Sequence, residues 1–305
     1  MPELTKKPDF FIVGAPKCGT TSFYHYLRQH PQIFMPDNKE PHYFGSDLKK
    51  RSDEFIKTEE EYLSLFKDAD PSQIAGEAST FYLYSKAAQE EIKSFNPHAK
   101  IIIMLRNPID FLHSLHAQFL FSGNEDVIDF SEALALEKER TQGNKLPPFI
   151  DLEDKLFYRE QVRRMPSQVG SYIQTFGNKN VLIILMEDLQ NKPGVVYKQA
   201  LKLLNVDSQF EPEFIVKNPS KKVHSFWLRN LVKKYHFRLG QLRGVFSDKP
   251  VGIIKFLIQK NSVAALREEI PLDLKVQLQK EFVSTIEKLE SIMNRNLSHW
   301  KGIPV

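Results

Sequence analysis

The sequence has one cysteine, Cys18, among its 305 residues, so no disulfide can form within the chain. That usage is typical of a reducing compartment. Long apolar runs are also missing, because Val251–Ile258 is short and is broken by Lys255. The first ten residues are followed by no apolar segment of the kind that a signal peptide needs. We therefore expect a cytoplasmic protein, peripheral to the inner face of a membrane at most.

Neither sign of charge is present in large excess. The chain has 42 basic and 38 acidic residues, a formal net charge of +4. This excess suits an anionic small ligand but is too weak to indicate nucleic acid. The sequence also lacks internal repeats and an evident linker, and 41% of its residues are hydrophobic. We expect one domain over residues 1–305 with a large core.

Short apolar runs alternate with segments of helical periodicity. The expected strands are Phe10–Val13, Ile74–Ala78, Lys100–Leu105 and Val181–Met186. The expected helices are Thr20–Gln29, Ser85–Phe95, one that begins at Pro108, Gly194–Leu204, and a C-terminal helix whose buried stripe is Leu278, Phe282, Ile286, Leu289 and Met293. Continuous apolar strands separated by helices predict a three-layer α/β fold with a central parallel sheet.

The first expected strand leads directly into GAPKCGTTS, Gly14–Ser22. A strand, a glycine-containing turn and a helix start place free backbone N–H groups and a helix dipole around one point, which favours an anion. In ATP- and GTP-binding loops a lysine follows the second glycine, but here Thr20 fills that place and Lys17 lies inside the turn. No expected strand ends in an aspartate that would hold magnesium. Both features argue against a metal–triphosphate enzyme.

Two further motifs carry candidate site residues. Arg106 follows the strand KIIIML, at the strand end where open α/β sheets bind ligands, and Ser114 lies about two helical turns later. A guanidinium with a hydroxyl suits a second phosphate. In KEPHYF, Glu40 and His42 are candidate proton acceptors, and Glu40 is expected to be extended because it precedes Pro41.

Together FFIVGAPKCGTTSFYHYLRQHPQI, KEPHYF, GEAS (Gly76–Ser79) and IIIMLRNPIDFLHS resemble the PAPS-dependent sulfotransferases, most closely their bacterial and Golgi carbohydrate-type branch. The resemblance implies a P-loop-nucleotide-hydrolase-like sulfotransferase fold and an enzyme that needs no metal. Its donor would be 3′-phosphoadenosine 5′-phosphosulfate (PAPS), and its product PAP. The implied donor-binding residues are Lys17, Cys18, Gly19, Thr20, Thr21, Ser22, Arg106 and Ser114.

The same resemblance implies catalytic roles. Glu40 would deprotonate an acceptor hydroxyl, with His42 sharing that role or taking it, and Lys17 would offset charge on the bridging oxygen. The acceptor would be a carbohydrate, a glycolipid or a small metabolite. Heparan-type relatives carry a lysine where this chain has Ala78, and some carry an arginine in place of Thr21, so the resemblance favours a less charged acceptor.

Residues 217–247 contain no acidic residue. Within them Lys221 and Lys222 resemble the family's late loop, which implies contact with the 3′-phosphate. Residues 226–243 mix aromatic and basic side chains, which fits either contact with an anionic membrane or, as the favoured interpretation, a solvated surface helix. His113 and His116 are three residues apart, but they are expected to be ordinary helix-face histidines rather than metal ligands.

Two other functions remain open from the sequence. One is a P-loop kinase that uses Mg-ATP, and the other is a PAP-binding module without catalysis. The displaced Lys17 and the Arg106–Ser114 pair favour the sulfotransferase over the kinase, and Glu40 favours it over the binding module. The sequence leaves the acceptor and the oligomeric state undetermined.

Overall fold

The computed structural model describes residues 6–49, 55–148, 150, 153–215, 221–223, 262–264 and 269–302. They fall into two compact units. The first unit comprises Met1–Pro108, Arg163–Asn218 and Val283–Val305, and the second comprises Ile109–Val162 and Pro219–Phe282. One domain over residues 1–305 stays a prediction.

A five-stranded sheet forms the centre of the first unit. Its strands are β1 (Phe10–Gly14), β2 (Ile33–Phe34), β3 (Ile74–Ala78), β4 (Lys100–Leu105) and β5 (Val181–Leu185). They lie in the order β2-β3-β1-β4-β5 and every neighbouring pair is parallel. The predicted parallel sheet is confirmed. The fourth expected strand is one residue shorter than predicted, because Met186 begins the next helix.

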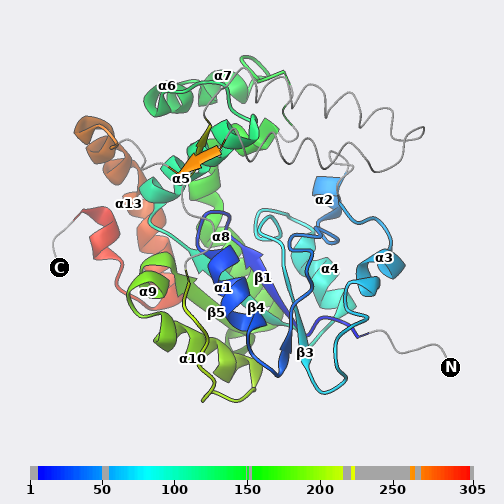
Figure 1. Cartoon of the computed structure of the whole chain (residues 1–305). Coiled ribbons are helices and arrows are strands. Elements are labelled where there is room, and N and C mark those ends of the chain that lie inside the picture. Colours follow the sequence, from blue (N-terminus) through cyan, green and yellow to red (C-terminus); the bar gives the residue numbers. More distant parts are fainter. Residues whose placement is uncertain are drawn as a thin grey trace, which may run out of the picture. The chain divides into compact units, whose positions relative to one another are not determined.

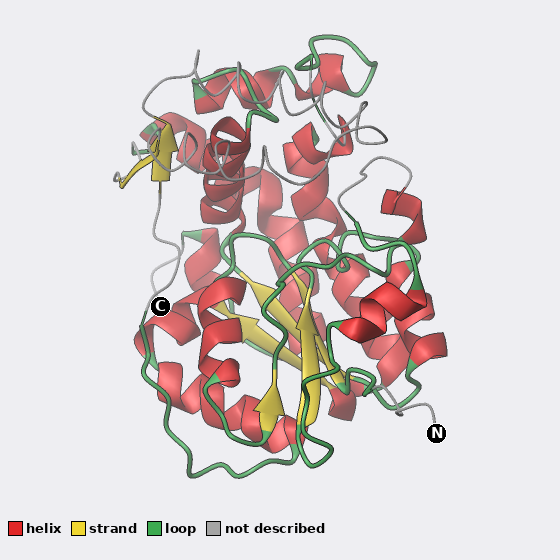
Figure 2. Cartoon of the chain, turned by 45° about the vertical axis from the view of Figure 1, so that its right-hand side comes forward, coloured by secondary structure: helices red, strands yellow, loops and turns green. Residues whose placement is uncertain are grey.

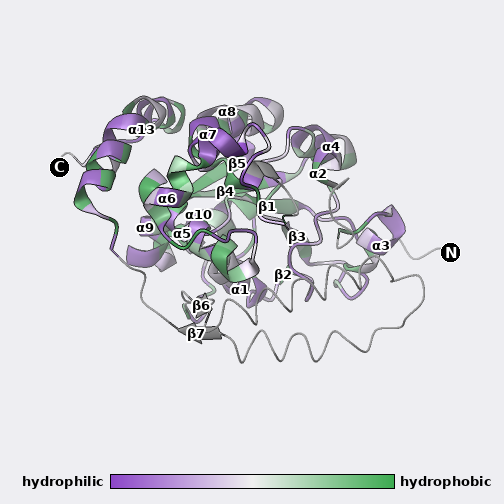
Figure 3. Ribbon diagram, turned by 90° about the horizontal axis from the view of Figure 1, so that it is seen from above, coloured by the Kyte–Doolittle hydropathy of each residue, from purple (hydrophilic) through white to green (hydrophobic). Residues whose placement is uncertain are grey.

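The central strands are apolar along their whole length because both of their faces are covered. All five residues of β1 are buried, and in β4 only Lys100 is partly exposed. Seen from above, α4 and α8 lie on one side of the sheet, and α1 and α10 lie on the other (Figure 3). This arrangement gives the three layers that the sequence predicts.

Several helices and two 3₁₀ turns lie wholly within the first unit. They are α1 (Thr20–Arg28), α2 (Ser46–Lys49), α3 (Glu59–Ser64), α4 (Ala88–Phe95), α9 (Met186–Asn191) and α10 (Pro193–Leu204), with 3₁₀ turns η2 (Asn178–Asn180) and η3 (Ser298–Lys301) (Figures 1 and 2). The helix expected from Ser85 begins instead at Ala88, because the Ser85 hydroxyl accepts from the Ala88 N–H at 2.9 Å and so precedes the helix.

Two long helices have residues in both units. They are α8 (Tyr158–Phe176) and α13 (Leu272–Met293). Of the stripe predicted for α13, the first four positions, from Leu278 to Leu289, are buried, while Met293 in its last turn is partly exposed. In the part of the chain that the structure describes, no helix combines the length and the apolar character needed to cross a membrane.

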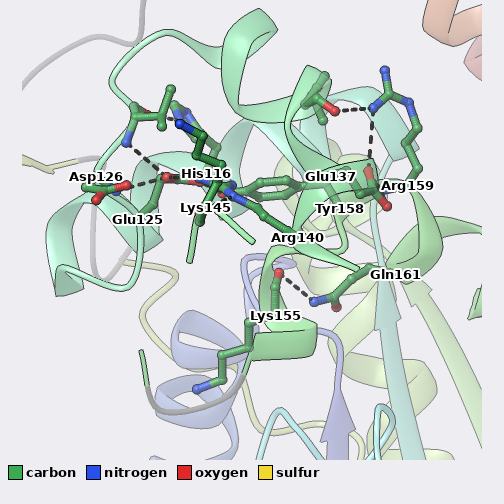
Figure 4. Close-up of polar contacts among 12 residues, drawn as sticks. His116, Glu125, Asp126, Glu137, Arg140, Lys145, Lys155, Tyr158, Arg159 and Gln161 are labelled. Carbon is green, nitrogen blue, oxygen red and sulfur yellow. Dashed lines mark hydrogen bonds and ion pairs between the residues drawn. The ribbon is translucent and has the colours of Figure 1, made fainter. Parts of the chain in front are cut away.

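The second unit contains α5 (Pro108–Ser122) from Ile109 onward, α6 (Phe130–Ala135), α7 (Glu137–Arg140), the 3₁₀ turn η1 (Glu153–Leu156), and the antiparallel pair β6 (Lys221–Val223) and β7 (Ser262–Ala264). Its polar centre is an ion pair between Glu125 and Arg140, whose side chains are 0% exposed (Figure 4). Arg140 donates to both carboxylate oxygens at 2.6 and 2.7 Å, and Tyr158 donates at 2.9 Å. Burial acts against the Glu125 charge, but these donors keep its pKa below the usual value.

The two histidines of α5 have ordinary structural surroundings. His116 is buried, and its Nε2 lies 2.9 Å from the Val127 carbonyl oxygen. Burial lowers the pKa of His116. His113 packs against the Phe130 ring with a centroid distance of 5.1 Å. Both histidines lie on α5, and that neither binds a metal stays a prediction.

Candidate active site

The turn after β1 is shaped by two glycines. Gly14 has φ 143° and Gly19 has φ 86°. A Cβ on Gly14 would lie 2.6 Å from the Thr80 carbonyl oxygen, and a Cβ on Gly19 would lie 2.8 Å from the Met186 sulfur. Neither position tolerates a side chain, so the glycine spacing of the motif reflects both backbone conformation and crowding.

The turn leads directly into the N-terminus of α1. Gly19 is the N-cap residue of α1, no side chain among the described residues forms a cap hydrogen bond, and the first turn contains no acidic residue. The hydroxyl-bearing residues Thr20 and Ser22 are buried at this end, and Thr21 is partly exposed. The N–H groups at a helix start and the positive end of the helix dipole make this a fitting site for an anionic phosphate or sulfate.

Arg106 reaches the same turn from the neighbouring strand. Ala15 N–H donates to the Met104 carbonyl at 2.7 Å, and Arg106 Nη1 donates to the Lys17 carbonyl at 3.4 Å. The structure therefore brings the predicted Lys17 and Arg106 together. Ser114 is 0% exposed on α5, and its hydroxyl has no partner in the described residues. It belongs to the second unit, so its pairing with Arg106 stays a prediction.

Cys18 is buried within the turn. Its thiol donates to the Pro16 carbonyl at 3.4 Å, and burial raises its pKa to about 12, with Glu187 adding to the rise and Arg106 and Lys17 opposing it. The thiol is therefore protonated and unreactive at neutral pH. A donor would meet this residue through its backbone N–H, and the contact stays a prediction.

The loop that carries Glu40 lies beside β3. Glu40 N–H donates to the Ala78 carbonyl at 3.0 Å. Glu40 has φ 65° and His42 has φ 48°, both in the left-handed region. The expectation that Glu40 is extended is therefore wrong. Proline favours an extended residue before it, but here the loop's tertiary contacts, including the bond to Ala78, override that preference.

Two side-chain nitrogens contact the Glu40 carboxylate. Lys39 Nζ donates to Glu40 Oε1, and His42 Nε2 lies 3.5 Å from Glu40 Oε2. Burial acts to raise the pKa of Glu40, but the bonds from His42 and Lys39 outweigh it and lower the pKa to about 2. The carboxylate is thus ionised in the free protein, and its side chain keeps 36% of its exposure to solvent.

A second carboxyl, Glu77 in β3, lies behind the loop and is 0% exposed. Tyr62 and Tyr82 both donate to Glu77 Oε2 at 2.9 Å. Burial raises the pKa of Glu77 to about 7, against the lowering effect of the hydroxyls of Ser79, Tyr62 and Tyr82. The GEAS motif alone predicts no role for this side chain.

The turn after β1 and the Glu40 loop meet at one edge of the sheet. β1 and β3 are paired in register at Ile12 and Ala78. Just beyond the strands, Ser79 N–H donates to the Ile12 carbonyl at 3.2 Å, and Leu83 N–H donates to the Val13 carbonyl at 2.7 Å. This carboxyl edge is where open α/β sheets bind ligands.

The remaining predicted residues are less informative. Lys221 and Lys222 form β6, but their side chains lie outside the described residues. Residues 226–243 lie outside them entirely. Among the residues that are described, no group of three or more histidine, cysteine or acidic side chains is arranged to hold a metal ion. The contacts of Ser79 and Tyr82 with the Glu40 loop were not predicted, because they join residues that are far apart in the sequence.

The fold and these two loops define a P-loop-like α/β protein with a helix N-terminus and a carboxylate loop at the same edge of its sheet. A family model described as a sulfotransferase domain matches residues 7–237. A solved sulfotransferase from Alicyclobacillus acidocaldarius is 28% identical with a TM-score of 0.72, and the match covers 97% of this chain and 99% of that one. The chain belongs to the PAPS-dependent sulfotransferase family.

Curated relatives agree with this assignment. Mouse carbohydrate sulfotransferase 15 is 28% identical over 262 residues, which cover 70% of this chain and 46% of the relative. The membrane-associated sulfotransferase kil1 of Dictyostelium discoideum is 24% identical, with coverages of 77% and 65%. This chain spans about half the length of the carbohydrate sulfotransferase 15 chains that it matches.

Proposed function

We propose that the chain transfers a sulfuryl group from PAPS to a hydroxyl of a carbohydrate or of a related small molecule. The observation that carries this proposal is the placement of the Glu40 carboxylate loop and the open α1 N-terminus at one edge of one sheet. The family supplies the donor. The name of carbohydrate sulfotransferase 15 supports the acceptor class.

The donor's phosphosulfate would bind at the turn after β1. The N–H groups of residues 19–22 and the hydroxyls of Thr20, Thr21 and Ser22 offer hydrogen bonds there, and Lys17 offers a charge. Arg106 and Ser114 would hold the 3′-phosphate, with Lys221 and Lys222 closing on it. No magnesium is needed to bridge phosphates, since the donor has no triphosphate.

Glu40 is the proposed general base. It takes the proton from the acceptor hydroxyl as the acceptor oxygen attacks sulfur, and the bond from sulfur to the bridging oxygen breaks. The electron pair stays on that oxygen, which leaves as part of PAP, and Lys17 stabilises its developing charge. The negative donor also raises the pKa of Glu40 from its low free value, which makes the carboxylate a stronger base in the complex.

His42 is the alternative base, and in this proposal it supports Glu40 instead. Its ring packs against Phe55 and Phe81, with centroid distances of 4.6 and 5.7 Å, and the side chain is 9% exposed. Glu40 is four times more exposed, so an acceptor approaching from solvent reaches the carboxylate first. His42 then orients the carboxylate through the 3.5 Å contact.

The test is a transfer assay with the purified chain, PAPS and a panel of neutral and sulfated oligosaccharides. We expect PAP release that depends on an oligosaccharide, with a mass increase of one sulfuryl group on it. Mg-ATP in place of PAPS should give no phosphorylated product. A phosphorylated product would indicate the kinase, and PAP binding without transfer to any acceptor would indicate the non-catalytic module. The cytoplasmic location and membrane contact through residues 226–243 remain proposals.

A further inference from the structure

Three alternate backbone N–H groups of the Glu40 loop are held by β3 and the turn that follows it. Glu40 N–H donates to the Ala78 carbonyl at 3.0 Å. His42 N–H donates to the Ser79 hydroxyl at 3.1 Å, and Phe44 N–H donates to the Tyr82 hydroxyl at 3.2 Å. The loop is thus fixed at every second residue, and two of its three acceptors are side chains.

The hydrogen bonds of the Tyr82 hydroxyl fix the orientation of its proton. A phenol has one proton to donate, and Tyr82 donates it to Glu77 Oε2 at 2.9 Å. Its oxygen lone pairs then face the Phe44 N–H. The whole arrangement is dry, because Tyr82 and Glu77 are 0% exposed and Phe44 is 5% exposed. Water therefore cannot replace a lost acceptor without opening the loop.

The backbone that this acceptor holds is a strained one. Glu40 and His42 are both non-glycine residues with positive φ, a conformation that costs free energy and persists only where the surroundings fix it. Glu40 Oε2 and His42 Nε2 lie 3.5 Å apart, so a change in the backbone of either residue would disturb this contact.

We propose that Tyr82 is a positioning residue for Glu40. It acts through the Phe44 N–H, Glu77 anchors its hydroxyl, and Ser79 supports the neighbouring His42 N–H. The inference rests on the proposed function, since it takes Glu40 as the base. Removing the Tyr82 hydroxyl should loosen residues 40–44 and misplace the carboxylate without touching the donor turn.

The chain offers a matched control in Tyr62. Tyr62 and Tyr82 are both 0% exposed, and both donate to the same oxygen, Glu77 Oε2, at 2.9 Å. Only the Tyr82 hydroxyl also accepts from the loop backbone. Tyr62→Phe therefore removes an equivalent bond from Glu77 and leaves the Phe44 N–H with its acceptor.

The test compares Tyr82→Phe, Tyr62→Phe and wild type by hydrogen exchange of peptic fragments that cover residues 40–46, and by steady-state kinetics. In Tyr82→Phe we expect exchange of the loop fragment to be about tenfold faster, and kcat to be about tenfold lower with an unchanged KM for PAPS. In Tyr62→Phe both should stay within about twofold of wild type. Ser79→Ala, which releases the His42 N–H, should behave like Tyr82→Phe and replaces it if that variant does not fold.

Equal exchange in the two tyrosine variants, or unchanged exchange in Tyr82→Phe, would overturn the proposal. The exchange measurement does not need turnover, so it separates two failures. Faster loop exchange in Tyr82→Phe together with full activity in Glu40→Gln would keep the positioning of the loop and remove the base role of Glu40. Unchanged loop exchange in Tyr82→Phe together with an inactive Glu40→Gln would keep the base role of Glu40 and remove the positioning role of Tyr82.

Discussion

Glu40 and His42 are two residues apart, both have left-handed backbones, and their side chains meet with Glu40 Oε2 3.5 Å from His42 Nε2. The loop thus directs two proton acceptors toward one point. Lys39 Nζ donates a hydrogen bond to the other carboxylate oxygen, Glu40 Oε1. Each oxygen of the Glu40 carboxylate is therefore contacted by a side-chain nitrogen.

Replacing Glu40 with glutamine should remove the base and keep the donor site. We expect kcat to fall by about two to four orders of magnitude, while the affinity for PAP, measured by calorimetry, stays within about threefold. Asp37→Asn is the control, because Asp37 lies on the preceding segment, pairs with Arg28 and is 90% exposed. Near-normal turnover in Glu40→Gln would transfer the base role to another residue.

The pH profile separates Glu40 from His42. With the pKa of Glu40 lowered to about 2 by His42 and Lys39, the base form persists as pH falls. We therefore expect kcat/KM, which reports the free enzyme, to have no acid limb between about pH 8 and pH 5. The measurement is initial rates at low acceptor concentration. An acid limb between about pH 6 and 7, where imidazoles ordinarily titrate, would point to His42.

Glu77 should make stability depend on pH. Its pKa is about 7 in the folded protein against an ordinary 4.5, so the folded state binds more protons between these values. The free energy of unfolding should therefore fall by roughly 3 kcal/mol as pH rises from about 4.5 to 7, relative to Glu77→Gln. Urea unfolding of both proteins across this range measures the difference. A difference that stays constant or grows with pH contradicts the prediction.

The buried pair of Glu125 and Arg140 should be far more costly to break than an exposed one. Arg140→Met leaves a carboxylate unpaired at 0% exposure, and we expect a loss of about 3–5 kcal/mol in urea unfolding. Arg295→Met is the control, since Arg295 forms a similar pair with Asp188 at 39% exposure and should lose less than about 1 kcal/mol. Equal losses would show that burial does not govern the cost.

Continuous apolar runs predicted four of the five strands of the sheet, but not the two-residue strand β2. β3 and β4 have the predicted bounds because their residues are buried on both faces, and such strands are recognisable from composition alone. The short helices α3, α6 and α7 were not predicted, since four to six residues show no clear periodicity. The glycine motif likewise predicted the turn after β1, because its requirements are local.

The Glu40 loop shows what a sequence cannot supply. The positive φ of Glu40 depends on a carbonyl 38 residues later, that of Ala78. The roles of Ser79 and Tyr82 depend on backbone groups of the loop after β2, which the parallel pairing of β2 and β3 brings near. Glu77 looks like a solvated carboxylate by residue type but is enclosed by two tyrosines.

The most direct test of the central claim, that the turn after β1 holds a PAPS-type donor, is a thermal unfolding experiment with PAP and, separately, with Mg-ATP. A ligand that binds only the folded state raises the unfolding temperature by mass action. We predict that PAP raises it, that Arg106→Ala weakens this effect, and that Mg-ATP has no comparable effect. Stabilisation by Mg-ATP and none by PAP would contradict the account.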